Sequence, residues 1–422
     1  MDTLYLRCIS LAGLALLVAL AWALSENRRA VSWRLVAWGM GLQFALGLLV
    51  MHTQAGVVFF QWVKAGFDIL TRASAEGGGF VFGNLNQVFF VDRLSIGPEG
   101  APQSEGPFLI AGVIAFQVLP VIIFVAGLSA MLLHLGVVQW VIQGIAWVMR
   151  RTLKTSGAET FGAALLIFLG IESVSALGGY LKGMTRSEIF TLMTGFLATI
   201  AASVMVAYAG FGAEPGHLLA ASLMSAPAGL VMAKLLVPET GTPQTSGAER
   251  IILPVESRNI FDAAARGAQN GLNMALNVAA LIMVFVGLIY LVDLAATALT
   301  GMTVTAILGW AFRPFAFIMG VPWADIGTVS ELLATKSVFN EFLAYQNMQP
   351  LIAEGALSPR AQTIATYALC GFANPGSLGI LIGGLDGMIP ERRAEVAGLS
   401  LKAFIAGTLA CFCTACVAGV LT

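Results

Sequence analysis

The chain has 422 residues, of which 58% are hydrophobic and only 11% are charged, and its formal net charge is -1. Soluble domains carry about 25% charged residues, so this composition excludes a soluble protein and predicts an all-α polytopic membrane protein. The near-neutral charge offers no basic face for nucleic acid. The five cysteines, an odd number, argue against a disulfide framework.

Hydropathy predicts the helices in chain order. A spanning helix needs about 20 mainly apolar residues. Two further apolar segments, 158–182 and 303–346, are interrupted by Gly, Pro, Asn or charged residues. Irregular backbone at membrane depth is tolerated where protein covers it or where it lines a cavity, so we predict that both are re-entrant hairpins. The eight predicted spans are roughly 4–24, 31–51, 108–136, 186–210, 217–237, 268–293, 361–384 and 397–421.

Between the second and third predicted spans, residues 57–70 mix aromatic and charged side chains and predict an amphipathic helix at the membrane interface. Gly77 to Gly79 predict a turn or hinge. Arginine and lysine gather after the first span, after the third, after the first hairpin and before the last span. The positive-inside rule then places both termini outside and lets the hairpins enter from opposite faces, as an inverted repeat produces.

This pattern divides the chain into five predicted segments. Residues 1–106 hold scaffold helices and the interfacial helix, and 107–157 hold the third span. Residues 158–237 form the first hairpin and repeat half, and 238–302 form a linker and the sixth-span scaffold. Residues 303–422 form the second hairpin and repeat half, which with the first makes up a transport domain.

Residues 335–345 place Lys336, Asn340 and Glu341 in an apolar setting. An ionisable group at membrane depth costs several kcal/mol unless it is paired or faces a wet cavity. A structural ion pair between Lys336 and Glu341 is one interpretation. We favour a solute site, because the amide of Asn340 both donates and accepts hydrogen bonds, as the vicinal hydroxyls of a sugar do.

Two other polar positions interrupt apolar runs. Glu172 has no basic residue near it in the sequence, and it is a candidate ligand contact and proton carrier, or a buried neutral carboxyl. Residues 374–377, Asn-Pro-Gly-Ser, break the seventh span and expose backbone groups beside Asn374 and Ser377. A polar stripe on the sixth span is more typical of helix association than of solute binding; it consists of Gln269, Asn273 and Asn277.

The stretches around Lys336, Asn340 and Glu341 and from Cys370 to Asn374 resemble the signature motifs of the concentrative nucleoside transporters. The resemblance covers most of residues 105–420. It implies an eight-span protomer with two opposed re-entrant hairpins, assembled as a homotrimer. It also implies that Glu341, Asn374 and Ser377 bind ribose, that Phe372 lies under the base, and that Glu172 is the acid of the first hairpin.

Two departures from the family pattern concern the first hairpin. The family has an amide and a hydroxyl before the hairpin acid, whereas this chain has Gly170 and Ile171, so recognition of the base must differ. The family's sodium site uses an asparagine where this chain has Leu165, while Thr199 keeps the hydroxyl of the next span. Because an isobutyl group removes one oxygen ligand, we favour coupling to protons over sodium, with Glu172 and Thr199 as ion-coupling candidates.

These features predict a cation-coupled symporter that imports nucleosides by alternating access across a bacterial cytoplasmic (inner) membrane, among membrane lipids. No Walker loop or hydrolase elbow is present in the sequence, so we expect no enzyme and no cofactor beyond H+ or Na+, and we assign no metal site. The alternatives are a transporter of another ribosylated or modified nucleoside, a membrane-embedded ligand sensor, and a membrane-embedded enzyme of the same fold.

Overall fold

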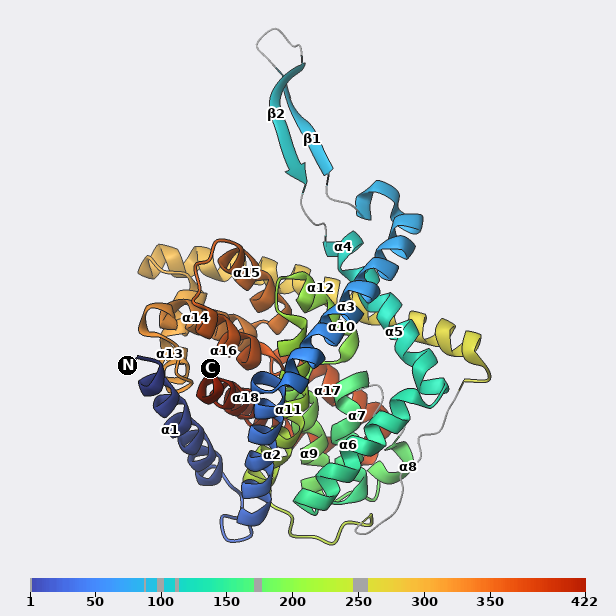
Figure 1. Cartoon of the computed structure of the whole chain (residues 1–422), viewed down its shortest axis with the longest axis vertical. Helices are drawn as coiled ribbons and strands as arrows, with labels where there is room; N and C mark the ends of the chain where they lie inside the picture. The colour runs from blue at the N-terminus through green and yellow to red at the C-terminus, as the bar shows by residue number, and fades with distance from the viewer. Residues whose placement is uncertain (1, 87–88, 97–101, 111–113, 171–176, 246–256) are drawn as a thin grey trace.

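The computed structural model describes residues 2–86, 89–96, 102–110, 114–170, 177–245 and 257–422 (Figure 1). Among these residues, six helices are long and apolar enough to cross a membrane. A seventh span is added if α5 (Leu119–His134) and α6 (Val137–Leu153), which meet at 77°, are counted as one. The predicted helical membrane fold is confirmed. The numbers of eight spans and two hairpins stay predictions.

The N-terminal part holds three long helices, α1 (Asp2–Ala23), α2 (Trp33–His52) and α3 (Gln54–Phe82). Thr53 caps the start of α3 by accepting a hydrogen bond from the Gly56 amide at 3.0 Å. The predicted turn at Gly77 to Gly79 is wrong, because α3 continues through it. Each helical glycine costs only about 1 kcal/mol relative to alanine, and a positive φ first occurs at Gly83, where α3 ends.

After the short η1 (Gly83–Asn86), the chain forms an antiparallel pair of strands that projects from the helical body (Figure 1). The strands are β1 (Phe89–Ile96) and β2 (Pro102–Ile110). The sequence patterns did not predict these strands, and β2 takes the first residues of the predicted third span, 108–136. The helical residues there are α4 (Ile114–Gln117) and α5, and α6 follows a left-handed Gly136 with φ of 79°.

A stripe of small residues packs α12 (Ile260–Thr300) against α5. The helix has 41 residues and is therefore about 62 Å long at 1.5 Å per residue. A Cβ atom at Gly267 would lie 2.6 Å from the Cβ of Ala130, and one at Gly271 would lie 2.8 Å from that of Ala126. Small residues let helix backbones approach this closely in membranes. The contact between α12 and α5 therefore uses glycines.

The segment predicted as the first repeat half contains α7 (Gly157–Leu169), α8 (Gly178–Leu181), α9 (Arg186–Ala198), α10 (Ala202–Gly210) and α11 (Pro215–Leu236). Capping boxes start two of these helices, with Ser156 and Glu159 at α7 and Thr185 and Glu188 at α9. Each box satisfies two orphan amide groups. The predicted span 186–210 is broken at residues 199–201, between α9 and α10.

The segment predicted as the second repeat half starts with α13 (Val304–Ile318), and a sharp turn at Gly320, with φ of 80°, follows this helix. The predicted hairpin 303–346 contains α13, η3 (Trp323–Asp325), α14 (Ile326–Val338) and the first residues of α15 (Glu341–Ala353). The re-entrant hairpin itself stays a prediction. The predicted break in the seventh span is confirmed, and the last elements are α16 (Pro359–Leu369), α17 (Pro375–Met388), η4 (Pro390–Arg392) and α18 (Arg393–Leu421).

The breaks of the two interrupted spans lie against each other in the core. The Phe372 amide donates to the Thr199 carbonyl oxygen at 3.3 Å. A Cβ atom at Gly371 would lie 2.9 Å from the Ala198 carbonyl oxygen and 2.4 Å from the Cys411 sulfur of α18. Only glycine fits this approach. The core brings together the non-helical backbone of both halves, which is where groups freed from helical hydrogen bonds can serve a solute.

Candidate functional site

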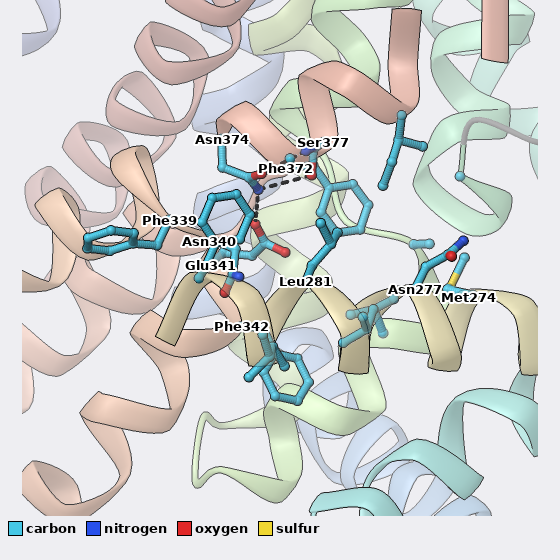
Figure 2. Close-up of a pocket in the computed structure, with 18 of the residues that line it drawn as sticks. Met274, Asn277, Leu281, Phe339, Asn340, Glu341, Phe342, Phe372, Asn374 and Ser377 are labelled. Atoms are coloured by element: carbon cyan, nitrogen blue, oxygen red, sulfur yellow. Dashed lines mark hydrogen bonds between the residues drawn. The ribbon is translucent and has the colours of Figure 1, made fainter. Parts of the chain in front are cut away.

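A pocket lies between the tip of the α14–α15 hairpin, the two broken spans and α12 (Figure 2). Figure 2 shows Glu341, Asn374 and Ser377 together at one end, with Met274 and Asn277 of α12 at the other. The lining is mostly apolar, which is typical of small-molecule sites with a few placed polar groups. Its other residues are Gly170, Phe196, Ala201, Val204, Tyr208, Val278, Leu281, Ile282, Phe285, Phe339, Asn340, Phe342, Phe372, Gly376 and Ile380.

Glu341 begins α15 and is the buried acid of the pocket, with a relative exposure of 5%. The Tyr208 hydroxyl donates to its Oε1 atom at 2.7 Å, and Asn374 Nδ2 donates to its Oε2 atom at 2.6 Å. These donors come from α10 and from the break before α17. An ionised carboxylate accepts at about four sites, so acceptor positions stay free for a solute.

The Asn374 side chain caps a helix with its oxygen and donates hydrogen bonds into the pocket with its nitrogen. Its Oδ1 atom accepts a hydrogen bond from the Ser377 amide at 2.8 Å and so caps α17. Its Nδ2 atom donates to Glu341 and to Ser377 Oγ, the latter at 3.0 Å. This cap explains why Asn374 is followed by Pro375, because asparagine is among the best N-cap residues and proline is favoured at the first helical position. The predicted cluster of Glu341, Asn374 and Ser377 is brought together.

Asn340 and Lys336 support the hairpin tip. Asn340 Oδ1 accepts a hydrogen bond from the Leu343 amide at 2.8 Å and caps α15. The Lys336 ammonium is fully buried and donates to the Ala368 carbonyl oxygen near the end of α16 at 2.7 Å. A cation at a helix C-terminus is favourable. This hydrogen bond ties Lys336 to the end of α16. The two described residues Lys336 and Glu341 form no ion pair with each other within 4.0 Å.

Aromatic and aliphatic side chains form the rest of the wall. The rings of Phe372 and Phe196 lie with centroids 5.4 Å apart at an interplanar angle of 40°. Leu281 and Ile282 approach from α12. A flat heteroaromatic group fits beside such rings, because aromatic pairs gain energy beyond the area they bury. The pocket therefore combines a polar end with an apolar, aromatic wall.

The structure describes only some of the candidate residues in the predicted first hairpin. Gly170 lines the pocket and ends α7 with φ of 70°. Ile171 and Glu172 lie outside the described residues, so their predicted roles stay predictions. Thr199 is buried beside the pocket, and its Oγ1 atom donates to the Gly195 carbonyl oxygen at 2.8 Å. Leu165 is fully buried in α7.

Among the pocket residues that were not predicted, three are notable. Tyr208 bonds Glu341 directly, Phe196 packs on Phe372, and Asn277 lines the pocket although its stripe was assigned to helix association. Tyr208 and Phe196 lie in apolar runs, where an aromatic side chain is most often a core residue. Only the polarity of Asn277 gave a signal at the sequence level.

Three family models match the chain. They are described as Na+ dependent nucleoside transporter N-terminus (residues 12–85), Nucleoside recognition (115–215) and Na+ dependent nucleoside transporter C-terminus (217–419). Curated relatives include mouse Solute carrier family 28 member 3, which is 38% identical over 98% of this chain. Mouse Sodium/nucleoside cotransporter 1 is also 38% identical over 98% of the chain.

The chain spans only 59% of the length of the first of these relatives and 64% of the second. Solved structures match over nearly their whole length. The structure titled "Structure of CNTnw in an inward-facing substrate-bound state" is 36% identical, with a TM-score of 0.89, and covers 98% of this chain and 99% of its own. An outward-facing structure of a CNTnw variant, also 36% identical, has a TM-score of 0.88 over 99% of this chain and 98% of its own.

Proposed function

The chain belongs to the concentrative nucleoside transporter family, and from this premise we propose that it is a secondary active symporter that imports nucleosides by alternating access. It is a multi-pass membrane protein. The observation that carries the proposal is the Glu341, Asn374 and Ser377 cluster at the polar end of the pocket. A carboxylate, an amide and a hydroxyl in one buried place match the alternating donors and acceptors of a sugar.

In the proposed complex the ribose hydroxyls meet Glu341, Asn374 and Ser377, with Asn340 at the edge of the polar end. The base lies along Phe372, toward Gly170 and the first-hairpin tip. The nearby Phe196 ring and the aliphatic face of α12 support this placement, because they provide a wall for a flat ring. Ile171 and Glu172 of the first hairpin are the remaining proposed contacts of the solute. A modified nucleoside or another ribosylated solute meets the same sugar contacts.

We propose protons as the coupling ion. Leu165 is a fully buried hydrocarbon and provides no oxygen ligand. The Thr199 hydroxyl, which donates its hydrogen to the Gly195 carbonyl oxygen, offers one oxygen ligand at most. Glu172 is the first candidate to carry the proton. Sodium is the second candidate, because the family models and a curated relative carry sodium in their names.

The moving part in this proposal consists of the two hairpins with the broken spans, and the early helices with the α5–α12 pair form the fixed scaffold. The glycine packing of α12 on α5 supports this division, since it ties the scaffold helices together. We further propose a homotrimer in a bacterial inner membrane with both termini outside. The two ends of the chain lie on the same side of the molecule (Figure 1).

The test is uptake of radiolabelled uridine and adenosine by purified protein in proteoliposomes, with a proton or a sodium gradient imposed separately. We expect accumulation driven by the proton gradient, and product analysis should recover the unaltered nucleoside. Accumulation driven by sodium alone would overturn the choice of ion. Saturable binding without accumulation would instead support a sensor, and a chemically changed product would support an enzyme.

A further inference from the structure

Tyr208 is one of the two described side chains that donate a hydrogen bond to the pocket acid, Glu341. It is fully buried in α10, and its ring stacks on Tyr345 of α15 with centroids 4.6 Å apart and an interplanar angle of 21°. Phenylalanine would fill that stack equally well. The hydroxyl is the additional feature, and it donates to Glu341 Oε1 at 2.7 Å. The side chain thus joins the broken fourth span to the tip of the second hairpin.

Each carboxylate oxygen of Glu341 accepts a hydrogen bond from a different side chain. Tyr208 occupies one acceptor position on Oε1, and Asn374 occupies one on Oε2. A carboxylate has about two acceptor positions on each oxygen, so the two side-chain donors leave one of these positions on each oxygen. A vicinal diol has two hydroxyls that can donate side by side, one to each oxygen. The donors therefore hold the carboxylate plane in the orientation that a diol needs.

We propose that Tyr208 is a positioning residue for diol recognition, because its hydroxyl orients Glu341 so that both carboxylate oxygens meet the two hydroxyls of a ribose. This inference rests on the proposed function, since it requires a nucleoside as the solute. It adds a selectivity: the preference for ribonucleosides over deoxynucleosides depends on Tyr208, which acts through Glu341. Loss of the Tyr208 hydroxyl lets the carboxylate rotate and weakens mainly the solute that uses both oxygens.

Tyr345 provides a matched control within the same stack. It is also fully buried, and its hydroxyl donates to the Thr366 carbonyl oxygen of α16 at 2.8 Å rather than to Glu341. Tyr208→Phe and Tyr345→Phe each remove one buried hydroxyl that donates one hydrogen bond. A merely structural role would therefore affect both variants alike. Only Tyr208→Phe removes a donor from the acid.

The experiment measures KM and Vmax of proteoliposome uptake for uridine and 3′-deoxyuridine with both variants. Hydrogen bonds to charged groups are strong enough that we expect Tyr208→Phe to raise the uridine KM about tenfold, and the 3′-deoxyuridine KM by less than about threefold. Tyr345→Phe should leave the ratio of the two KM values as in the wild type. An unchanged ratio in Tyr208→Phe, or the same fall in both variants, would overturn the inference.

A second pair of variants covers the possibility that Tyr208→Phe does not fold. Tyr208→His keeps an aromatic ring with a hydrogen-bond donor, whereas Tyr208→Leu keeps neither. The inference expects the histidine variant to retain more of the preference for uridine, and equal loss in both would contradict it. The two proposals also fail separately. Wild-type protein that accumulates no uridine refutes the proposed function, whereas wild-type uptake with an unaltered preference in Tyr208→Phe refutes only the role of Tyr208.

Discussion

Asn374 Nδ2 lies 2.6 Å from Glu341 Oε2, although 33 residues separate the two in the chain. Asn374 caps the start of α17, and Glu341 is the first residue of α15. Each sits at a helix N-terminus, where the helix dipole favours negative charge and polar solute groups. The contact therefore joins two helix ends at the pocket, and it makes the acid and the amide one recognition unit.

Asn374→Asp should separate the two tasks of Asn374. Aspartate caps helices about as well as asparagine, so we expect α17 to remain folded. The donor to Glu341 is replaced by a second carboxylate, and two close carboxylates repel each other. Uridine KM should rise at least about tenfold in proteoliposome uptake, as expected for the loss of a charge-assisted hydrogen bond. Asn259→Asp, at the exposed cap of α12, is the control, and equal kinetics in the two variants would contradict the role.

Leu165→Asn should make uptake respond to sodium. The substitution brings an amide oxygen into a fully buried position of α7, and oxygen is the ligand that hard cations prefer. We expect a sodium gradient to drive uridine accumulation in the variant and not in the wild type. Leu166→Asn, at a position that is equally buried, controls for the cost of a buried amide, about 1–3 kcal/mol. No difference in ion preference between the variants would count against this reading of Leu165.

Lys234→Met should destabilise the protein strongly. The Lys234 ammonium lies 2.7 Å from Glu159 Oε2 and 3.2 Å from Glu239 Oε2, and Lys234 and Glu159 are buried. Removing one partner of a buried pair leaves an uncompensated charge and costs about 3–5 kcal/mol. Lys182→Met breaks an exposed pair with Glu391, 3.3 Å apart, and should cost at most about 1 kcal/mol. Thermal melting in detergent compares them, and similar melting points would refute this estimate.

Glu26→Gln should lower stability at neutral pH but not in acid. Glu26 lies between α1 and α2, and the hydrogen bond from Arg186, together with that from Lys402, holds the pKa of its carboxyl below the ordinary value. A lowered folded-state pKa stabilises the protein above the unfolded pKa of about 4.3 and loses this contribution as pH falls through the folded value.

The pair is partly exposed, so we expect a difference of at most about 1 kcal/mol at pH 7. The melting points of Glu26→Gln and wild type should converge below about pH 4. Glu354→Gln, at an exposed carboxylate that follows α15, is the control. A difference between wild type and Glu26→Gln that grows on acidification would contradict the sign of the effect.

The polar half of the candidate site could be predicted because its residues conflict with their surroundings. Glu341 in an apolar run and the helix-disfavouring residues from Asn374 to Ser377 are conspicuous at membrane depth, and the structure places them in contact. The family motifs pointed to the same residues. A polar residue in an apolar run strongly indicates a functional site in a membrane protein, because protein or water must satisfy its hydrogen bonds.

The rest could not be predicted, because it depends on contacts between distant segments. Residues 199–201 have no glycine or proline to mark the break between α9 and α10; the break is fixed by the crossing at Gly371 and Phe372. Tyr208 looks like a core aromatic until its hydroxyl is seen on Glu341. The end of strand β2 takes the place of the start of the predicted span 108–136, since an apolar run alone does not distinguish strand from helix.

Uridine uptake by Glu341→Gln tests the central claim most directly. The substitution keeps the size of the side chain and one acceptor oxygen, and it removes the charge that receives Tyr208, Asn374 and the proposed sugar hydroxyls. In proteoliposomes with an imposed proton gradient, the account predicts accumulation by the wild type and none by the variant, with both proteins equally folded and reconstituted. Wild-type rates of accumulation by Glu341→Gln would contradict it.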